Sequence, residues 1–337
     1  MKKNLTPPYP WQAGLWQQLI HDRQQLAHAL LLYGRAGIGK YAFARYLSQA
    51  LLCKQPVEGH PCGECASCHW FNEESHPDFR LLTPEQATEP DDESASSKKT
   101  KKKTQISVAQ IRDLSEFLSL SSHRNDGARI VLIQPAEALN AASANALLKM
   151  LEEPAPGVIF ILVANQLQRL LPTIISRCQK VSMPAPNESQ ALAWLSEQGL
   201  QNAQQQLAYA SGSPIQVMNE QAQLNTFAEI WRQFALGNKL QPHLAATMLI
   251  AHSAETGIIA LQKWLCDLIT MCLTKQVRYH IAQSGALQGL ADKVNLSQLM
   301  QLQKKVDELR KLATHPLNHE LQLEALLVEY TRVFVNK

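Results

Sequence analysis

The chain has 337 residues, a hydrophobic fraction of 45% and a charged fraction of 18%, which predicts a folded globular protein of two or three domains. Its formal net charge of +3 is too small to predict strong independent binding to nucleic acid. The aliphatic runs fall far short of the roughly 20 residues of a membrane helix, and the N-terminus carries prolines where a secretory signal is apolar. We therefore expect a cytoplasmic protein with no membrane contact.

The first predicted elements are a helix and a strand. Residues 12–28 carry apolar side chains at roughly helical intervals, which predicts an amphipathic helix. The apolar run from Ala29 to Leu32 predicts a buried strand, and residues 42–52 return to helical spacing. The segment between them therefore connects a strand to a helix.

That connecting segment is rich in glycine. Gly34 and Gly39 have the spacing of a phosphate-binding loop, in which backbone N–H groups surround phosphate oxygens and Lys40 supplies a positive charge. The next residue is Tyr41, where an active loop has a Ser or Thr hydroxyl for magnesium. We therefore expect a vestigial loop that does not bind ATP productively.

A cysteine cluster follows the predicted helix. Its members are Cys53, Cys62, Cys65 and Cys68. The two overlapping C-x-x-C turns let the thiolates reach one ion, and four thiolates favour tetrahedral Zn²⁺ with a closed coordination shell. We predict a structural zinc module over residues 53–68. A disulfide or redox pair and an iron–sulfur cluster are the alternatives, and His60, His69 and His76 are expected at the surface.

Residues 85–104 have a different composition from the rest of the chain. Acidic residues come first and five lysines follow between positions 98 and 103, without apolar periodicity. This composition predicts a disordered, solvated loop. The alternative is that the lysine run contacts DNA or another acidic surface.

The strand predicted at residues 130–133 ends without the groups that an ATPase needs. Gln134 and Pro135 follow it, where an active phosphate-loop enzyme has carboxylates that bind magnesium and position water. Glu137 comes about a helical turn too late to replace them. This second deficiency agrees with the first, so we expect no independent ATPase activity.

The next segments complete the predicted α/β region. Asn140 is a plausible N-cap of a helix that Pro154 ends, and residues 158–163 predict another buried strand that leads to Asn165. A short strand is expected near Val181. Beyond it, residues 188–198 and 201–211 predict two helices of a small domain, and the apolar stripes after residue 225 predict a helix bundle.

Two motifs resemble a known family. Residues 144–154, Ala-Asn-Ala-Leu-Leu-Lys-Met-Leu-Glu-Glu-Pro, and the triplet Ser176-Arg177-Cys178 are similar to the clamp-loader branch of the AAA+ ATPases, as is the position of the cysteine cluster. The resemblance covers residues 9 to about 215. It implies that residues 1–184 form an α/β AAA+ domain (RecA-like parallel sheet) that includes the zinc module. A small helical lid domain is then expected over 185–225 and an all-α collar domain over 226–337.

The resemblance also implies a role for Arg177. In this family the arginine of the Ser-Arg-Cys motif enters the nucleotide site of the neighbouring subunit as an arginine finger. A further family arginine, in a G-S-x-R setting of the second domain, is replaced by Ile215. The chain therefore resembles a non-catalytic subunit that forms a ring with gamma or tau and delta subunits, and this ring loads the sliding clamp onto primed DNA. The alternative for Arg177 is a surface arginine that pairs with a carboxylate.

Two other functions remain as hypotheses. One is an autonomous ATPase of the clamp-loader type with an unusual magnesium site, which predicts tight magnesium-dependent nucleotide binding and turnover. The other is a zinc-dependent DNA-binding module formed by the cysteine cluster and the lysine run, which predicts salt-sensitive DNA affinity of the isolated chain.

Overall fold

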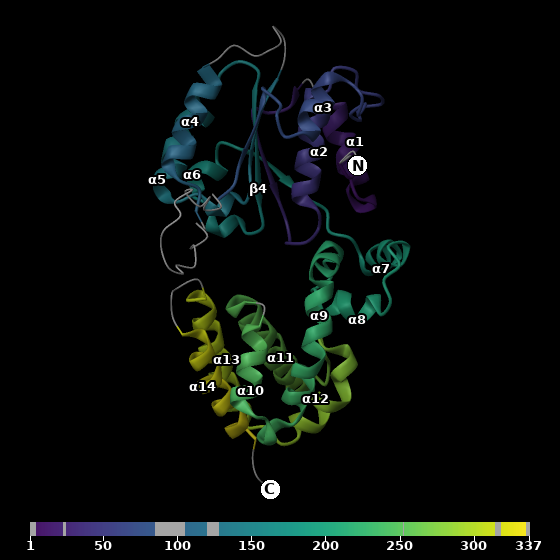
Figure 1. Cartoon of the computed structure of the whole chain (residues 1–337), viewed down its shortest axis with the longest axis vertical. Helices are drawn as coiled ribbons and strands as arrows, with labels where there is room; N and C mark the ends of the chain where they lie inside the picture. Colours follow the sequence, from purple (N-terminus) through teal and green to yellow (C-terminus); the bar gives the residue numbers. More distant parts are fainter. Residues whose placement is uncertain are drawn as a thin grey trace, which may run out of the picture. The chain divides into compact units, whose positions relative to one another are not determined.

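The computed structural model of the protein describes residues 5–22, 25–84, 105–119, 128–251, 253–313 and 318–334, without the side chains of residues 119 and 221–226. The chain divides into two compact units, Met1–Pro186 and Asn187–Lys337 (Figure 1). The loop predicted at residues 85–104 lies outside the described residues.

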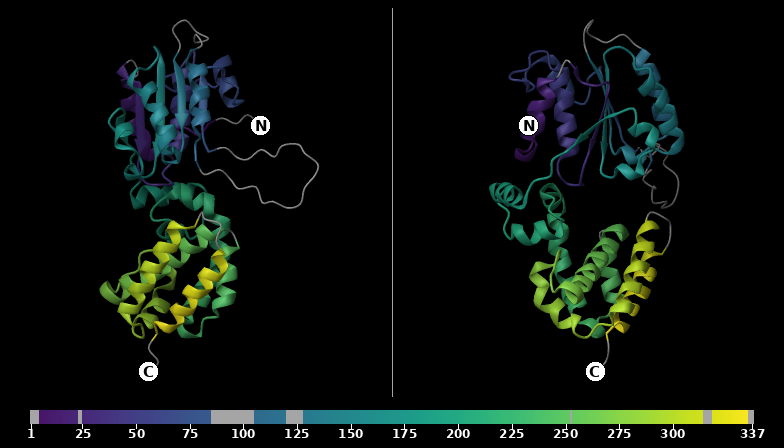
Figure 2. Two further views of the ribbon diagram at one scale, coloured as in Figure 1. Left: turned by 90° about the vertical axis from the view of Figure 1, so that its left-hand side faces the viewer. Right: turned by 180° about the vertical axis from the view of Figure 1, so that it is seen from behind.

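The first unit is built on a parallel sheet of five strands in the order β2-β3-β4-β1-β5 (Figure 2). The strands are β1 (Ala29–Tyr33), β2 (Phe79–Leu82), β3 (Arg129–Ile133), β4 (Val158–Ala164) and β5 (Gln179–Ser182). Apart from Arg129 at the start of β3, the three central strands are apolar, because both faces of a parallel sheet are covered. The predicted strands at residues 29–32, 130–133 and 158–163 and near Val181 are confirmed. The edge strand β2 was not predicted, because its four residues include Arg80 and show no clear alternation.

Helices cover both faces of this sheet (Figure 1). On one face, side chains of alternate strand residues such as Leu31 and Val131 pack against α4, α5 and α6, and on the other face their neighbours Leu30 and Leu132 pack against α1 and α2. The helices of the unit are α1 (Ala13–His21), α2 (Lys40–Leu52), α3 (Ala66–Asn72), α4 (Val108–Ser119), α5 (Ala141–Glu152) and α6 (Pro172–Ile175), with 3₁₀ turns η1 (Pro10–Gln12), η3 (Ala136–Ala138) and η4 (Leu167–Arg169). Asn140 caps α5 as predicted, since its side chain accepts a hydrogen bond from Ser143 N at 2.9 Å.

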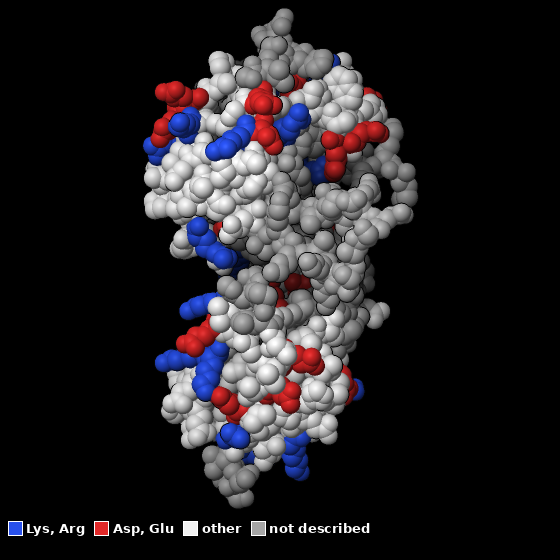
Figure 3. All heavy atoms as spheres, turned by 60° about the vertical axis from the view of Figure 1, so that its left-hand side comes forward, with Lys and Arg blue, Asp and Glu red and all other residues white. Residues whose placement is uncertain are grey.

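Surface charge is mixed. On the face that Figure 3 shows, Lys and Arg side chains are interspersed with Asp and Glu. This pattern agrees with the small net charge of the sequence. The lysine run of residues 98–103 lies outside the described residues, so its predicted alternative role as a DNA contact stays a hypothesis.

The second unit is helical throughout its described residues. Its helices are α7 (Glu188–Glu197), α8 (Ala203–Tyr209), α9 (Pro214–Ala235), α10 (Pro242–Ile250), α11 (Ala254–Thr274), α12 (Ser284–Ala291), α13 (Leu296–Lys311) and α14 (His319–Arg332), with 3₁₀ turns η5 (Gly237–Lys239) and η6 (Ile281–Gln283). Two separate apolar clusters lie in it. The start of α9 contributes Val217 to a small cluster with α7 and α8, and the end of α9 contributes Phe234 to the larger bundle. The boundary that we expected at residues 225/226 therefore lies inside a continuous helix.

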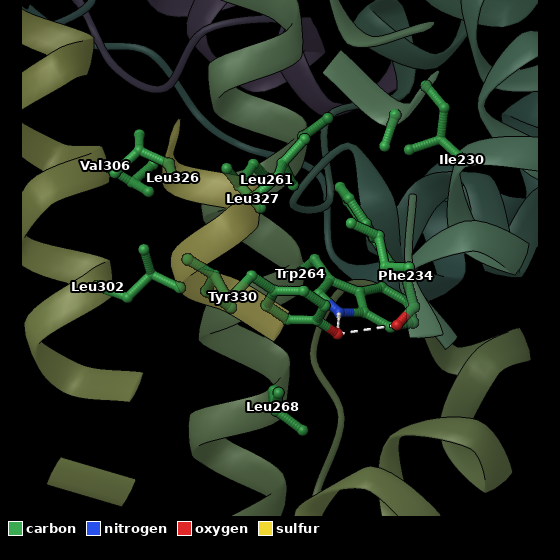
Figure 4. Packing of buried hydrophobic residues seen from close by; sticks show 14 of the residues in the cluster. Ile230, Phe234, Leu261, Trp264, Leu268, Leu302, Val306, Leu326, Leu327 and Tyr330 are labelled. Carbon is green, nitrogen blue, oxygen red and sulfur yellow. Dashed lines mark hydrogen bonds between the residues drawn. The ribbon is translucent and has the colours of Figure 1, made fainter. Parts of the chain in front are cut away.

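The larger cluster is centred on α11, which packs against α10, α12, α13 and α14. Trp264, Phe234 and Tyr330 lie together in its interior and are all 0% exposed (Figure 4). The indole Nε1 of Trp264 donates to the Tyr330 hydroxyl at 3.0 Å, and this hydroxyl donates to the Phe234 carbonyl at 2.8 Å. The polar groups of two large aromatic side chains are thus satisfied inside an apolar bundle.

By length and composition alone, α11 could cross a membrane. Its packing gives the simpler explanation, because Leu261, Trp264, Leu265 and Leu268 are all 0% exposed and face the other helices of the bundle. A core helix of a helical bundle has this character. The sequence did not single out this helix as a membrane candidate, since the charged residues Lys263 and Asp267 interrupt its aliphatic runs.

Candidate functional site

The glycine-rich loop lies between β1 and α2, as the sequence predicts. Gly37 and Gly39 have φ values of 72° and 89°, in the left-handed region that side chains with a Cβ rarely adopt. A Cβ on Gly39 would lie 2.4 Å from Cε2 of Tyr9. Glycine is therefore required at Gly39 both for backbone conformation and for the close approach of the N-terminal segment.

The ammonium group of Lys40 points back into its own loop. Lys40 is 4% exposed, and its Nζ donates to the carbonyl of Gly34 at 2.9 Å and to that of Arg35. Burial lowers the pKa of Lys40 to about 8, although the charge of Glu137 acts in the opposite direction. The charge that would meet a phosphate is thus held by loop carbonyls.

The N-terminal segment forms hydrogen bonds with this loop. Trp11 Nε1 and Gln12 Nε2 both donate to the carbonyl of Ile38, at 3.1 Å and 2.9 Å. Tyr9 stacks on Trp11 with ring centroids 4.9 Å apart. Sequence reasoning missed these residues, because a Tyr-Pro-Trp triplet ahead of a helix does not by itself indicate that it will fold onto a loop 26 residues later.

The residues near the position where an active enzyme binds magnesium form other contacts in this structure. Tyr41 is half-buried and packs against the sheet core, and the Arg45 guanidinium lies 6.0 Å from its ring centre. Glu137 Oε1 accepts hydrogen bonds from the backbone N–H groups of Asn165 and Gln166, at 2.5 Å and 2.7 Å. In this structure the Glu137 carboxylate therefore caps the end of β4.

The four predicted cysteine ligands lie together. Their sulfur atoms all lie within 4.8 Å of one another, with Sγ–Sγ distances of 3.5 Å from Cys53 to Cys62, 3.9 Å from Cys53 to Cys65 and 4.0 Å from Cys62 to Cys68. A tetrahedral ion about 2.3 Å from each sulfur has edges of about 3.8 Å. The cluster therefore has the size and donor set to hold one metal ion.

Backbone groups support the same interpretation. The backbone N–H groups of Cys62 and Cys65 donate to the sulfur atoms of Cys53 and Cys62, at 3.3 Å and 3.4 Å. Burial raises the pKa of Cys53 and Cys68. At Cys65 burial acts in the same direction, but backbone hydrogen bonds together with side-chain hydrogen bonds from Cys62 and Cys68 outweigh it and lower the pKa to about 6. Four thiolates this close repel one another, so a bound cation is what would stabilise them together.

The expectation that the nearby histidines are surface residues was wrong for His76. His76 is 5% exposed; its Nδ1 accepts a hydrogen bond from Asp78 N at 3.0 Å, and its Nε2 lies 2.8 Å from the Ser67 hydroxyl. Ser67 in turn donates to the Leu52 carbonyl at 2.7 Å. This chain of hydrogen bonds connects the cysteine cluster to α2 and to the segment before β2. His60 is half-buried and stacks on Trp16.

The Ser-Arg-Cys triplet connects α6 to β5. Cys178 is 8% exposed and lies in the core, where burial raises its pKa to about 11. Ser176 Oγ donates to the Thr173 carbonyl at 3.0 Å. Arg177 lies between these two anchored residues, and its side chain is 34% exposed. The triplet thus presents one arginine at the surface of the first unit.

Arg177 is already paired in this chain. Its Nη1 donates to the Thr173 carbonyl at 3.1 Å and to the Ser176 hydroxyl at 3.3 Å. Its Nη2 lies 2.5 Å from Oε1 of Glu152, at the end of α5. The pairing of a surface arginine with a carboxylate, which was the alternative to a finger, is therefore present. The Arg177 side chain remains one-third exposed despite this pairing.

Comparisons with known proteins agree on one family. A family model described as "DNA polymerase III, delta subunit" matches residues 11–187. The chain is 35% identical over 336 residues to the DNA polymerase III subunit delta' of Pseudomonas aeruginosa, a match that covers 96% of this chain and 97% of that protein. It is 36% identical to the subunit of the same name from Haemophilus influenzae, covering 57% of this chain and 54% of that protein. The Escherichia coli subunit is 34% identical, covering 61% of this chain and 58% of that protein.

Proposed function

The chain belongs to the DNA polymerase III delta' family, and from this premise we propose that it is a non-catalytic subunit of the bacterial clamp loader. In this proposal it forms a ring in the cytoplasm with gamma or tau and delta subunits. The ring opens the sliding clamp and places it on primed DNA, as part of the DNA polymerase III holoenzyme. This chain supports the ring and donates Arg177 to a neighbouring ATP site.

The observation that carries the proposal is a contrast between two cations. Lys40, which would serve a nucleotide on this chain, is 4% exposed and bonded to the carbonyls of Gly34 and Arg35. Arg177, which would serve a nucleotide on a neighbour, is one-third exposed at the surface. Tyr41 and Gln134 occupy the places of the magnesium-binding hydroxyl and carboxylate. The vestigial loop of Gly34, Gly39 and Lys40 is then a structural connection.

The chemistry of a guanidinium suits the donated role. Arg177 is always charged and can form forked hydrogen bonds with phosphate oxygens. In the transition state of phosphoryl transfer, negative charge spreads over the oxygens of the transferred group, so a cation from the next subunit accelerates the reaction.

Zinc is the metal that the cysteine cluster suits best. Cys53, Cys62, Cys65 and Cys68 would hold Zn²⁺ through four sulfurs, and a closed tetrahedral shell supplies structural stability without an open position for water. The hydrogen bonds of Ser67 and His76 would carry that stability to the sheet.

The second unit supplies the remaining parts of the proposal. The small cluster around α7, α8 and the start of α9 corresponds to the lid domain, and the bundle around α11 corresponds to the collar that holds the ring together. Large helical bundles commonly associate through their outer faces. Assembly with the relatives would therefore depend on this unit.

The test is single-turnover ATP hydrolysis by a ring reconstituted from this chain with gamma and delta subunits, clamp and primed DNA. Arg177→Ala should slow the phase that comes from the receiving site by about 10³-fold, because arginine fingers are worth about 10³–10⁵ in rate. Arg80→Ala is the matched control, since Arg80 lies on β2 at the opposite edge of the sheet from β5. An unchanged phase in an intact Arg177→Ala ring would contradict the donated role.

A further inference from the structure

The ion pair of Arg177 suggests how the finger is prepared for its neighbour. Glu152 is the last residue of α5, and its carboxylate lies 2.5 Å from Arg177 Nη2. Glu152 belongs to the Leu-Glu-Glu-Pro segment that ends the motif of residues 144–154. The two motifs that carry the family resemblance are thus joined by a direct contact between side chains.

The contacts of the guanidinium are distributed unevenly. A guanidinium has five N–H groups. The two on Nη1 are directed at the Thr173 carbonyl and the Ser176 hydroxyl, and one on Nη2 is directed at Glu152. Among the described residues, the Nε–H and the second N–H of Nη2 have no acceptor. Acceptors from α5 and from α6 therefore restrain the group and leave two donors for another molecule.

We propose that Glu152 is a positioning residue: it holds the Arg177 guanidinium in the orientation that presents its two remaining donors to a phosphate of the neighbouring subunit. This inference rests on the proposed donation of Arg177. A long arginine side chain loses much rotamer freedom when it is ordered, and Glu152 imposes that order before the neighbour binds. Glu152 itself does not touch the nucleotide.

An opposite role for the same contact would have a different consequence. If the carboxylate mainly neutralised Arg177, removing it would free the finger and speed the neighbour's reaction. If it mainly orients Arg177, removing it slows the reaction. The geometry favours orientation, because the Glu152 carboxylate contacts only Nη2 and leaves the Nε–H and the second N–H of Nη2 for a phosphate.

The test uses the reconstituted ring with substituted forms of this chain. Glu152→Ala should slow the single-turnover phase of the receiving site about two- to fivefold, the range set by one partly exposed ion pair. The ATP concentration at half-saturation should not change, because a finger acts in the transition state. Glu152→Gln keeps an oxygen that can accept from Nη2 and should retain most of the rate.

Glu153→Ala is the matched control, because it removes the neighbouring exposed carboxylate, which has no contact with Arg177 in the structure. Glu152→Ala should cause no further loss in an Arg177→Ala ring, since both changes act through one group. A Glu152→Ala ring with an unchanged or faster phase would overturn the positioning role while leaving the donated arginine intact. An Arg177→Ala ring with an unchanged phase would overturn both.

Discussion

Removing the Tyr330 hydroxyl tests whether its two buried hydrogen bonds stabilise the helical bundle. In Tyr330→Phe the ring and its packing remain, but the Trp264 Nε1–H loses its acceptor at 3.0 Å and the Phe234 carbonyl loses its donor at 2.8 Å. A buried polar group left without a partner costs about 1–3 kcal/mol. The Phe234 carbonyl keeps a second contact, from the backbone N–H of Leu236, so most of the cost falls on the indole. We expect a loss of about 2 kcal/mol in the stability of the bundle.

Hydrogen exchange is the suitable assay, because a chain with two compact units need not unfold in one step. A loss of about 2 kcal/mol should speed the exchange of the slowest α11 amides about 30-fold. Tyr279→Phe is the control, since it removes a hydroxyl from a half-buried tyrosine of the same unit. A less than threefold change in α11 exchange for Tyr330→Phe would refute the reasoning about buried polar groups.

Three further predictions concern other parts of the chain. Purified protein should contain one Zn²⁺, and removing it with a chelator or by Cys65→Ser should lower the unfolding free energy of the first unit by about 3 kcal/mol or more. The control variant Cys272→Ser should retain the metal. Metal analysis with thermal unfolding checks this prediction, and a stable, metal-free native protein would contradict it. Burial lowers the pKa of His280, which lies 2.8 Å from Asp267. The imidazole of His280 therefore binds a proton near pH 6.5 in the unfolded chain but only at a lower pH in the folded chain. The second unit should therefore lose stability as the pH falls from 7 to 5, and His280→Asn should reduce this slope; a slope unchanged by the substitution would count against it. Gly39→Ala should destabilise the first unit by about 1–3 kcal/mol through its positive φ and its contact with Tyr9, while Gly14→Ala, in the open on α1, should be neutral or stabilising by denaturant titration.

Much of the fold could be predicted because its signals are local. A few neighbouring residues are enough to predict the apolar strands at residues 130–133 and 158–163, the Asn140 cap and the C-x-x-C turns. The edge strand β2 gave no such signal. Its pairing with β3 joins residues far apart in the chain, such as Phe79 and Ile130, and a short mixed segment does not reveal such long-range contacts.

The candidate sites divide in the same way. The cysteine ligands were predicted because metal binding dictates both residue type and spacing, and the structure brings all four together. The pairing of Arg177 with Glu152 joins two separate motifs, whereas Lys40 with Gly34 and His76 with Ser67 are only six and nine positions apart. All of these contacts depend on the orientation of polar side chains, which residue type and spacing do not specify. Polar side chains of this kind are commonly exposed, so periodicity alone gives no reason to expect His76 to be buried.

The proposed function is that this chain lends a cation to a neighbour's nucleotide and hydrolyses none of its own. Its most direct test is the ATPase activity of the isolated chain with magnesium, measured beside a Lys40→Ala variant that removes the buried ammonium of the loop. We expect no turnover above that of the variant. ATP turnover at a rate of about 1 s⁻¹ or more that Lys40→Ala abolishes would contradict it.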